Sequence, residues 1–183
     1  MSAPREAPAP ERDGPEDPWS AAADLVDAAR TGDVLALDAL LEPLAPYVAA
    51  LCRPIAPDHS SDAAQEALNA VFQGLPRLRD SRALYARVRT ITVREAVRVA
   101  RRAQRETPVC GLDDAPRPGG PEPAADVRDV LGRMSAEHRA VLVLRGLEGL
   151  DERSVSRILG ISRGTVRSRL HRARRGFRTA RSG

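Results

Sequence analysis

The apolar positions of this chain repeat at the three- and four-residue spacing of α-helices, and no stretch alternates as a strand would. The clearest repeat lies in the first half of the chain and consists of Ala64, Ala67, Leu68, Val71, Phe72 and Leu75. An earlier stripe covers Leu37–Leu51, and because Pro43 and Pro46 fall inside it we predict a helix that is kinked or split in two. A long third helix is predicted over Ser81–Arg105, so the fold class is predicted to be all-α.

The C-terminal third of the chain has the spacing of a helix-turn-helix. A small residue at Ser156, the glycine Gly160 and the β-branched Val166 allow two helices to cross closely, with the second helix held outward. The cap and turn signals that divide this part into short helices are Ser135, Gly149, Asp151, Gly160 and Ser162. The second helix of such a motif can enter the DNA major groove, which is about 12 Å wide. This part of the chain is therefore predicted to bind DNA.

Proline marks the boundaries between these parts. Ten of the 15 prolines lie in Met1–Pro18 or Glu106–Ala125, at a density that helices do not tolerate. We predict a disordered tail over residues 1–18, a helical domain over 19–105, a linker over 106–125 and a helix-turn-helix domain over 126–183.

The charge is arranged in blocks that the small overall net charge of +4 conceals. All 29 basic residues are arginines, and the net charge is −9 over residues 1–76, +8 over 77–105, −4 over 106–127 and +9 over 128–183. One narrow arc of the predicted third helix holds Arg87, Arg94, Arg98, Arg101 and Arg105. Arginine makes bidentate contacts with phosphate, so this stripe is predicted to follow a nucleic-acid backbone, although a solvated helix face gives the same pattern.

The sequence argues against several other classes of protein. No run of 18 apolar residues is present and the N-terminus lacks the apolar core of a signal peptide, so no membrane insertion and a cytoplasmic location are expected. Cys52 and Cys110 are too few for a disulfide framework. His59, His138 and His171 have no further ligands at metal-binding spacing, so neither a metal nor another cofactor is expected. The motifs of common enzyme sites are missing, and the chain is not expected to be an enzyme.

Two segments resemble the extracytoplasmic-function (ECF) sigma factors of bacterial RNA polymerase. Residues Arg133–Arg178 are similar to region four of this family, most specifically in the run LGISRGTVRSRLHRAR over Leu159–Arg174. Residues 62–102, DAAQEALNAVFQGLPRLRDSRALYARVRTITVREAVRVARR, resemble region two. The resemblance implies a promoter-specificity subunit that binds core RNA polymerase, recognises the −10 and −35 promoter elements and leaves RNA synthesis to the core enzyme.

The resemblance also implies roles for individual residues. The −35 element would be read by the last helix, through Ser162, Arg163, Thr165, Arg167, Ser168, Arg169, His171 and Arg172. The −10 element and the adjoining backbone would be contacted by Arg79, Asp80, Ser81, Arg82, Arg87, Arg89, Arg94, Arg98 and Arg101. The clamp of the largest polymerase subunit would be contacted by Asp62, Gln65, Glu66 and Asn69. The polymerase flap region, promoter DNA and an anti-sigma factor are further partners that the resemblance implies.

Two positions depart from the family pattern of region two. When Leu84 and Tyr85 are matched to that pattern, the family's arginine is kept at Arg89, but Ala83 stands where a tryptophan is usual and Thr90 where an asparagine is usual. These departures favour an alternative, a stand-alone helix-turn-helix regulator that does not engage polymerase as a sigma subunit. A second alternative is an adaptor whose arginine stripe holds acidic protein partners, and it predicts no salt-sensitive binding to DNA.

Overall fold

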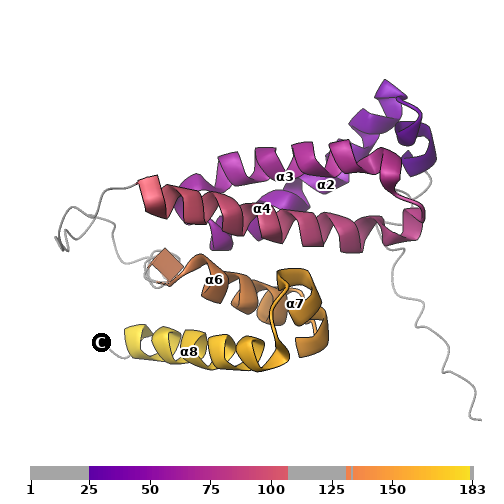
Figure 1. Cartoon of the computed structure of the whole chain (residues 1–183). Helices are drawn as coiled ribbons and strands as arrows, with labels where there is room; N and C mark the ends of the chain where they lie inside the picture. Colours follow the sequence, from indigo (N-terminus) through magenta and orange to yellow (C-terminus); the bar gives the residue numbers. More distant parts are fainter. Residues whose placement is uncertain (1–24, 107–130, 133, 182–183) are drawn as a thin grey trace, which may run out of the picture.

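The chain folds into two groups of helices that pack against each other (Figure 1). The computed structural model describes residues 25–106, 131–132 and 134–181, and within these ranges it contains helices and no strand, which confirms the all-α prediction. The N-terminal unit consists of a helical stretch over 25–30, α2 (Val34–Ile55), η1 (Pro57–His59), α3 (Ser60–Gly74), η2 (Leu75–Arg77), η3 (Ser81–Ala83) and α4 (Leu84–Glu106). The C-terminal unit consists of α6 (Ala136–Leu142), η4 (Val143–Leu147), α7 (Glu152–Leu159) and α8 (Arg163–Arg181).

Helix α2 is one continuous element although it contains Pro43, Pro46 and Pro54. It begins at Asp33, whose carboxylate accepts hydrogen bonds from two N–H groups of the first turn, at 2.9 and 3.2 Å. A proline in a helix interior costs about 3 kcal/mol, and burying one leucine or valine side chain contributes about 1.5–3 kcal/mol. The buried stripe of α2 consists of Ala36, Leu40, Leu44, Val48, Leu51, Cys52 and Ile55. Burial outweighs the cost of the prolines, so the alternative of a split helix is wrong.

By length and composition α2 could cross a membrane, even though its sequence contains no uninterrupted run of 18 apolar residues. The core helix of a bundle in water satisfies the same criteria. In this structure α2 packs against both α3 and α4, and α3 packs against α4, so the three helices share one apolar core. Its apolar composition is accounted for by this position at the centre of the N-terminal unit.

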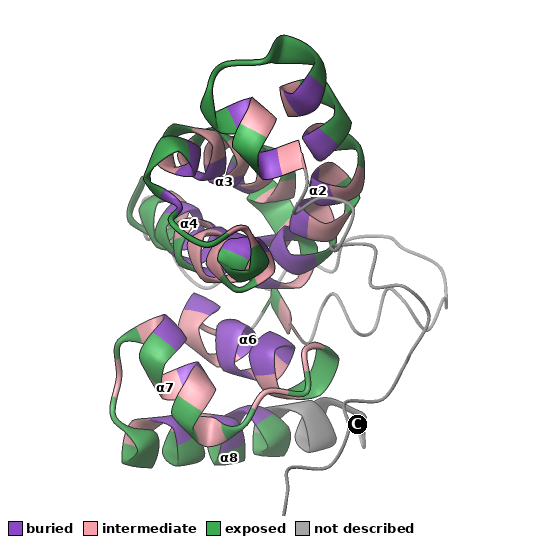
Figure 2. Cartoon of the chain, turned by 90° about the vertical axis from the view of Figure 1, so that its right-hand side faces the viewer, coloured by how far each residue is buried: buried purple, intermediate pink, exposed green. Residues whose placement is uncertain are grey.

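Three of the predicted cap and turn residues lie at helix ends in the C-terminal unit. The Asp151 carboxylate accepts a hydrogen bond from the Ser154 N–H at 2.8 Å and begins α7, and the Ser162 hydroxyl accepts one from the Thr165 N–H at 3.0 Å and begins α8. Gly160 between them has φ of +65°, the left-handed conformation that ends α7. The predicted helix-turn-helix is therefore confirmed, and Figure 2 shows α6 mostly buried above the more exposed α8.

The segment before the helix-turn-helix is not a regular α-helix over its whole length. The α-helix ends at Leu142, and the next turn, η4, has the wider π-helical spacing. The Glu148 N–H accordingly donates to the Val143 carbonyl at 3.1 Å, five residues earlier. Glu148 directly follows this wide turn and lies at the boundary with the N-terminal unit.

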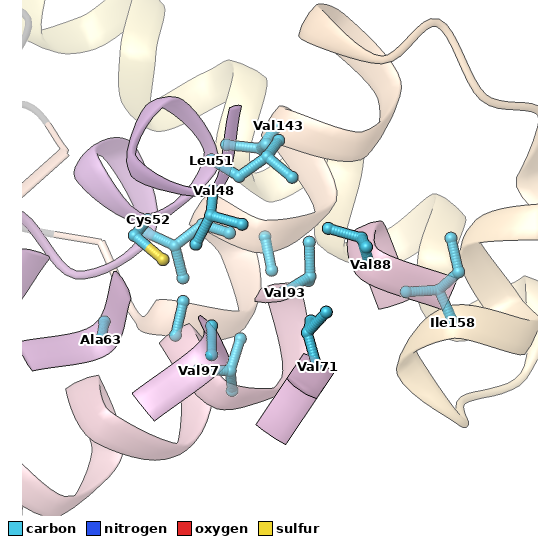
Figure 3. Packing of buried hydrophobic residues seen from close by; sticks show 14 of the residues in the cluster. Val48, Leu51, Cys52, Ala63, Val71, Val88, Val93, Val97, Val143 and Ile158 are labelled. Atoms are coloured by element: carbon cyan, nitrogen blue, oxygen red, sulfur yellow. The ribbon is translucent and has the colours of Figure 1, made fainter. Parts of the chain in front are cut away.

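A continuous apolar cluster joins the two units (Figure 3). Val143 of η4 lies beside Leu51 of α2. Ile158 of α7 lies on the same side of the cluster as Val88 of α4. Arg139 of α6 is 4% exposed and crosses the same boundary, because its Nε donates to the carbonyl of Ile55 at 2.7 Å. Burial lowers the pKa of Arg139, and the nearby Asp58 and Glu137 partly compensate. Apolar packing and buried hydrogen bonds together hold the C-terminal unit against the N-terminal unit.

Candidate nucleic-acid interface

Helix α8 presents the predicted −35-reading residues to one side of the molecule. Its inward stripe, Val166, Leu170 and Ala173, is buried, and α8 packs against both α6 and α7. The outward residues that are exposed are Ser162, Arg163, Arg167, Ser168, His171 and Arg172, with Thr165 and Arg169 half-buried. The helix-turn-helix thus presents most of the eight predicted residues on the exposed surface of α8, as groove recognition requires, whereas Arg169 faces the boundary with α4 and α6.

The arginines of α8 are largely without carboxylate partners. Arg167 forms an ion pair with Glu152 of α7, with Nε 2.7 Å from Oε2. Within the described part of the chain, Arg163, Arg169, Arg172 and Arg174 form no ion pair. Their charge also affects a neighbour, because burial and the positive charges of Arg169 and Arg172 lower the pKa of His138. The outer face of α8 is therefore a source of uncompensated positive charge.

The predicted arginine stripe on α4 has a different environment. Arg94 donates from Nε to the Ile158 carbonyl at 2.7 Å and from Nη2 to the Arg157 carbonyl at 3.3 Å, so it contacts the end of α7. Arg98 pairs with Glu66 and with Glu95. Arg101 pairs with Glu137 across the boundary between the units. These three residues lie together as predicted, but each one is engaged by groups of the protein itself.

Two other residues of the predicted −10 contact set turn inward. Arg87 is half-buried, and its Nη2 donates to the carbonyl of Gly74 at 3.4 Å. The side chain of Arg89 is 15% exposed and pairs with Glu148 at 3.4 Å. Within the predicted stripe Arg87 thus differs from the exposed Arg94 and Arg98, because its side chain packs back onto the end of α3.

The loop before α4 remains accessible. Arg79, Asp80 and Arg82 are exposed and Ser81 is half-buried, while Leu78 is buried and anchors the loop. Asp80 shapes the segment, because its carboxylate accepts a hydrogen bond from the Arg82 N–H at 3.0 Å. The residues assigned to the −10 element thus separate into an exposed loop and an engaged helix face.

The acidic face of α3 is partly used within the molecule. Asp62, Gln65 and Asn69 are exposed, as a docking surface requires. Glu66 instead pairs with Arg98 and with Arg102, the latter at 3.1 Å. The predicted polymerase-docking set therefore offers three exposed side chains, with its central carboxylate already bound to α4.

A cleft of about 700 Å³ lies between α4 and the helix-turn-helix, and we call it the arginine cleft. Its arginines are Arg94, Arg98, Arg101, Arg102, Arg105 and Arg169. Val97, Leu159 and Ile161 add apolar surface. The cleft exists because the two units are docked, so its walls combine residues predicted to meet the −10 and the −35 elements.

Sequence reasoning missed a polar cluster at the boundary between the units. Tyr47 and Tyr85 donate from their hydroxyls to Oε2 of Glu148 at 3.0 and 2.9 Å, and Arg89 donates to the same oxygen at 3.4 Å. Burial raises the pKa of both tyrosines and Glu148 raises it further, while the contact with Tyr85 raises the pKa of Tyr47 and the contact with Tyr47 partly lowers that of Tyr85, so both hydroxyls stay protonated at neutral pH. Tyr47 and Glu148 are 101 residues apart, and no local pattern could have paired them.

The described residues show neither a metal site nor a reactive thiol. No three His, Cys, Asp or Glu side chains among them are placed to hold a metal ion. Cys52 is a free, buried thiol whose pKa burial raises to about 12, and Cys110 lies outside the described residues. The chemistry of the candidate site is therefore that of arginine, hydroxyl and carboxylate groups.

The geometry of the C-terminal unit defines a class of protein. The sigma-70 region 4 family model matches residues 124–175, which include the helix-turn-helix. Together with the outward, arginine-rich α8, this match places the C-terminal unit in the sigma-70 class of DNA-binding proteins.

Similar proteins narrow the class to one family. RNA polymerase sigma-E factor of Streptomyces coelicolor is 32% identical over 127 residues, which cover 66% of this chain and 72% of that protein. ECF RNA polymerase sigma factor SigM of Mycobacterium tuberculosis is 31% identical over 121 residues, or 64% of this chain. That match spans 61% of SigM. The chain belongs to the ECF family of RNA polymerase sigma factors.

Solved structures share the fold. The sigma factor RpoE from Bartonella quintana, solved in complex with the anti-sigma factor NepR, superimposes with a TM-score of 0.60 at 23% identity, covering 78% of this chain and 94% of that one. CnrH, solved in complex with the cytosolic domain of CnrY, gives a TM-score of 0.58 at 22% identity, covering 87% of this chain and 96% of that one. The likeness extends across both helical units.

Proposed function

We propose that this chain is a cytoplasmic promoter-specificity subunit that binds core RNA polymerase and directs transcription initiation. In this proposal the domain over residues 126–183 reads the −35 element through α8, and the domain over 19–105 acts at the −10 element. The core enzyme supplies the catalysis of RNA synthesis. The observation that carries the proposal is the outer face of α8, where a helix-turn-helix of the sigma-70 class exposes Arg163 and Arg172, which form no ion pair within the described part of the chain.

Docking on polymerase is assigned to the exposed part of the α3 face and to the C-terminal unit. Asp62, Gln65 and Asn69 would contact the clamp of the largest subunit, and the C-terminal unit would contact the flap region. An anti-sigma factor is a further proposed partner, supported by the fold relative RpoE, which was solved in complex with the anti-sigma factor NepR.

The test is gel filtration of the full chain with purified bacterial core RNA polymerase, with and without competing housekeeping sigma factor. Stoichiometric binding that the competitor displaces is expected. A triple variant, Asp62→Ala with Gln65→Ala and Asn69→Ala, should bind more weakly, whereas Asp38→Ala on the exposed side of α2 serves as the control. If the folded chain does not bind at micromolar concentration, the proposal fails and the stand-alone regulator becomes the working hypothesis.

A further inference from the structure

Three hydrogen-bond donors converge on one carboxylate oxygen at the boundary between the units. Tyr47 of α2 and Tyr85 and Arg89 of α4 all donate to Oε2 of Glu148, at 3.0, 2.9 and 3.4 Å. The Glu148 side chain is 10% exposed and comes from the other unit, directly after η4. The arrangement is that of an oxyanion-binding site whose present occupant is a carboxylate of the same chain.

The donors are held in place by the N-terminal unit itself. The rings of Tyr47 and Tyr85 are 5.0 Å apart and tilted by 41°, and the Arg89 guanidinium lies 5.1 Å from the centre of the Tyr85 ring. None of these ring contacts involves the C-terminal unit. These ring contacts favour the same arrangement of the three donors when Glu148 is withdrawn, which would leave the charge of Arg89 without the Glu148 carboxylate.

Glu148 fills this site incompletely. Arg89 reaches the shared oxygen only at 3.4 Å, and its buried Nε has no hydrogen-bond partner within the described part of the chain. A carboxylate and a phosphate diester each share one negative charge between two oxygens, but the diester is a larger tetrahedral group with two additional bridging oxygens. Arginine favours bidentate contact with such a group. The buried Nε of Arg89 is a donor that Glu148 leaves without a partner and that an oxyanion with more acceptor oxygens, such as a phosphate diester, could engage.

The position of the site indicates which phosphate it would take. Tyr85 and Arg89 are one turn apart at the start of α4, immediately after the exposed loop that contains Arg79 and Arg82. Under the proposed function this loop lies on the path of the promoter strand that is separated near the −10 element. A strand leaving the loop toward α2 would pass the three donors.

We propose that Tyr47, Tyr85 and Arg89 bind one backbone phosphate of single-stranded promoter DNA, and that Glu148 occupies this site as an internal competitor when the two units are docked. This inference rests on the proposed function. Strand binding and separation of the units are then coupled, because the phosphate and Glu148 use the same donors. Docking of the C-terminal unit withholds the site, and withdrawal of Glu148 opens it.

The test compares Glu148→Ala with Glu152→Ala in the full chain. Both variants remove one carboxylate from the C-terminal unit and release one arginine, but Glu152 pairs with Arg167 away from the boundary. Binding of a fluorescein-labelled oligo(dT) of about 12 nucleotides is followed by fluorescence anisotropy. Hydrogen bonds to charged groups are worth about 1.5–3 kcal/mol, so Glu148→Ala is expected to bind roughly tenfold more tightly than Glu152→Ala. Equal affinities would overturn the competition.

Further variants locate the phosphate within the opened site. In the Glu148→Ala background, Tyr47→Phe and Tyr85→Phe remove only hydroxyls and should each weaken binding several-fold. Thr90→Val is the matched control, because the Thr90 hydroxyl bonds within its own helix to the Ala86 carbonyl at 2.7 Å. Arg89→Gln should reduce the salt dependence by about one phosphate contact. If none of these changes exceeds that of the control, the DNA site lies elsewhere and the assignment is wrong.

Three additional measurements complete the test. Glu148→Gln keeps the side-chain volume while removing the charge, and an intermediate gain in affinity is expected even if Glu148→Ala folds poorly. Inorganic phosphate at millimolar concentration should not displace the oligonucleotide, and displacement would assign the site to a free anion instead of DNA. If the chain does not bind core polymerase but the oligonucleotide affinities change as expected, the proposed function alone is refuted. If the chain binds core polymerase normally but Glu148→Ala and Glu152→Ala bind the oligonucleotide equally well, this inference alone is refuted.

Discussion

Helices α4 and α8 are both rich in arginine, but the arginines of the two helices differ in their interaction partners. On α4, Arg94 binds the end of α7, and Arg98 and Arg101 are paired with glutamates. On α8, Arg167 pairs with Glu152, whereas Arg163 and Arg172 are exposed and form no ion pair within the described part of the chain. One helix uses its arginines to hold the molecule together, and the other keeps them available.

The difference shows that an arginine stripe does not by itself identify a nucleic-acid surface. Carboxylates of α3, α4 and α6 lie opposite the arginines of α4, whereas α8 faces outward and meets few acidic residues. Substituting α4 arginines should therefore affect stability and docking of the units, and substituting α8 arginines should affect DNA binding. The following predictions test that division.

The largest expected effect is a loss of stability on substitution of Arg139, a buried arginine whose guanidinium donates to carbonyls inside the protein. Its Nη1 donates to the carbonyls of Leu131 and Met134 at 2.9 and 2.7 Å, in addition to the contact with Ile55. Arg139→Ala should lower the free energy of unfolding by about 3–5 kcal/mol, because it leaves several buried groups without partners. Urea denaturation measures the change. The exposed Arg53→Ala is the control, expected within about 0.5 kcal/mol of the parent.

The outward arginines should show the opposite behaviour. Arg167→Ala and Arg172→Ala are each expected to weaken binding to a −35 duplex by about tenfold, since one arginine contact to DNA is worth about 1–3 kcal/mol. The free energy of unfolding should stay nearly constant. Anisotropy titration with a duplex selected from a random pool measures the affinity, and Arg153→Ala on exposed α7 surface is the control. Parent-like affinity in both variants would remove α8 from the assignment.

Arg94 should behave as a docking residue. Arg94→Ala removes two hydrogen bonds to carbonyls at the end of α7, and because the side chain is exposed the expected loss of stability is about 1 kcal/mol. Arg105 lines the same cleft but forms no ion pair among the described residues. Arg105→Ala should therefore lower the stability less than Arg94→Ala does. Equal losses in denaturation experiments would mean that Arg94 does not support docking.

The smallest expected effect concerns His138. Burial and the charges of Arg169 and Arg172 lower its pKa in the folded chain, so folding favours the neutral ring. The corresponding stability is present above the usual histidine pKa of about 6.5 and is lost as the pH falls through that value toward the lower folded pKa. A loss of less than about 1 kcal/mol between pH 7.5 and 5 is expected. His138→Gln should reduce this slope, and the exposed His59→Gln should not.

The parts of the fold set by neighbouring residues could be predicted from the sequence. Asp151, Gly160 and Ser162 act within one helical turn of their own positions, and the structure confirms each of them. The continuous course of α2 was harder to foresee, because the cost of a proline is local while the burial that offsets it depends on α3 and α4. The helix caps could therefore be predicted from neighbouring residues, whereas the balance between the cost of the α2 prolines and the burial of the α2 apolar residues could not.

The candidate site also has one part that could be predicted from the sequence and another that could not. The outward residues of α8 follow from helical spacing, because their buried counterparts fix the orientation of the helix. The pairing of Glu148 with Tyr47 and Tyr85 depends on how two units dock, and no sequence period carries that information. Arg87 also could not be placed, because a long side chain on the edge of a stripe can turn toward either neighbour.

The contact of Arg94 with α7 has a consequence for local unfolding. The last turn of a helix leaves carbonyls without intrahelical partners, and here a guanidinium from the other unit satisfies two of them, at Arg157 and Ile158. When the units part, the turn is held by the N–H groups of Gly160 and Ile161, which both donate to the Ser156 carbonyl. Those two amides should then exchange their hydrogens with solvent faster, so the helix-turn-helix becomes more pliable at the moment when it is released to meet DNA.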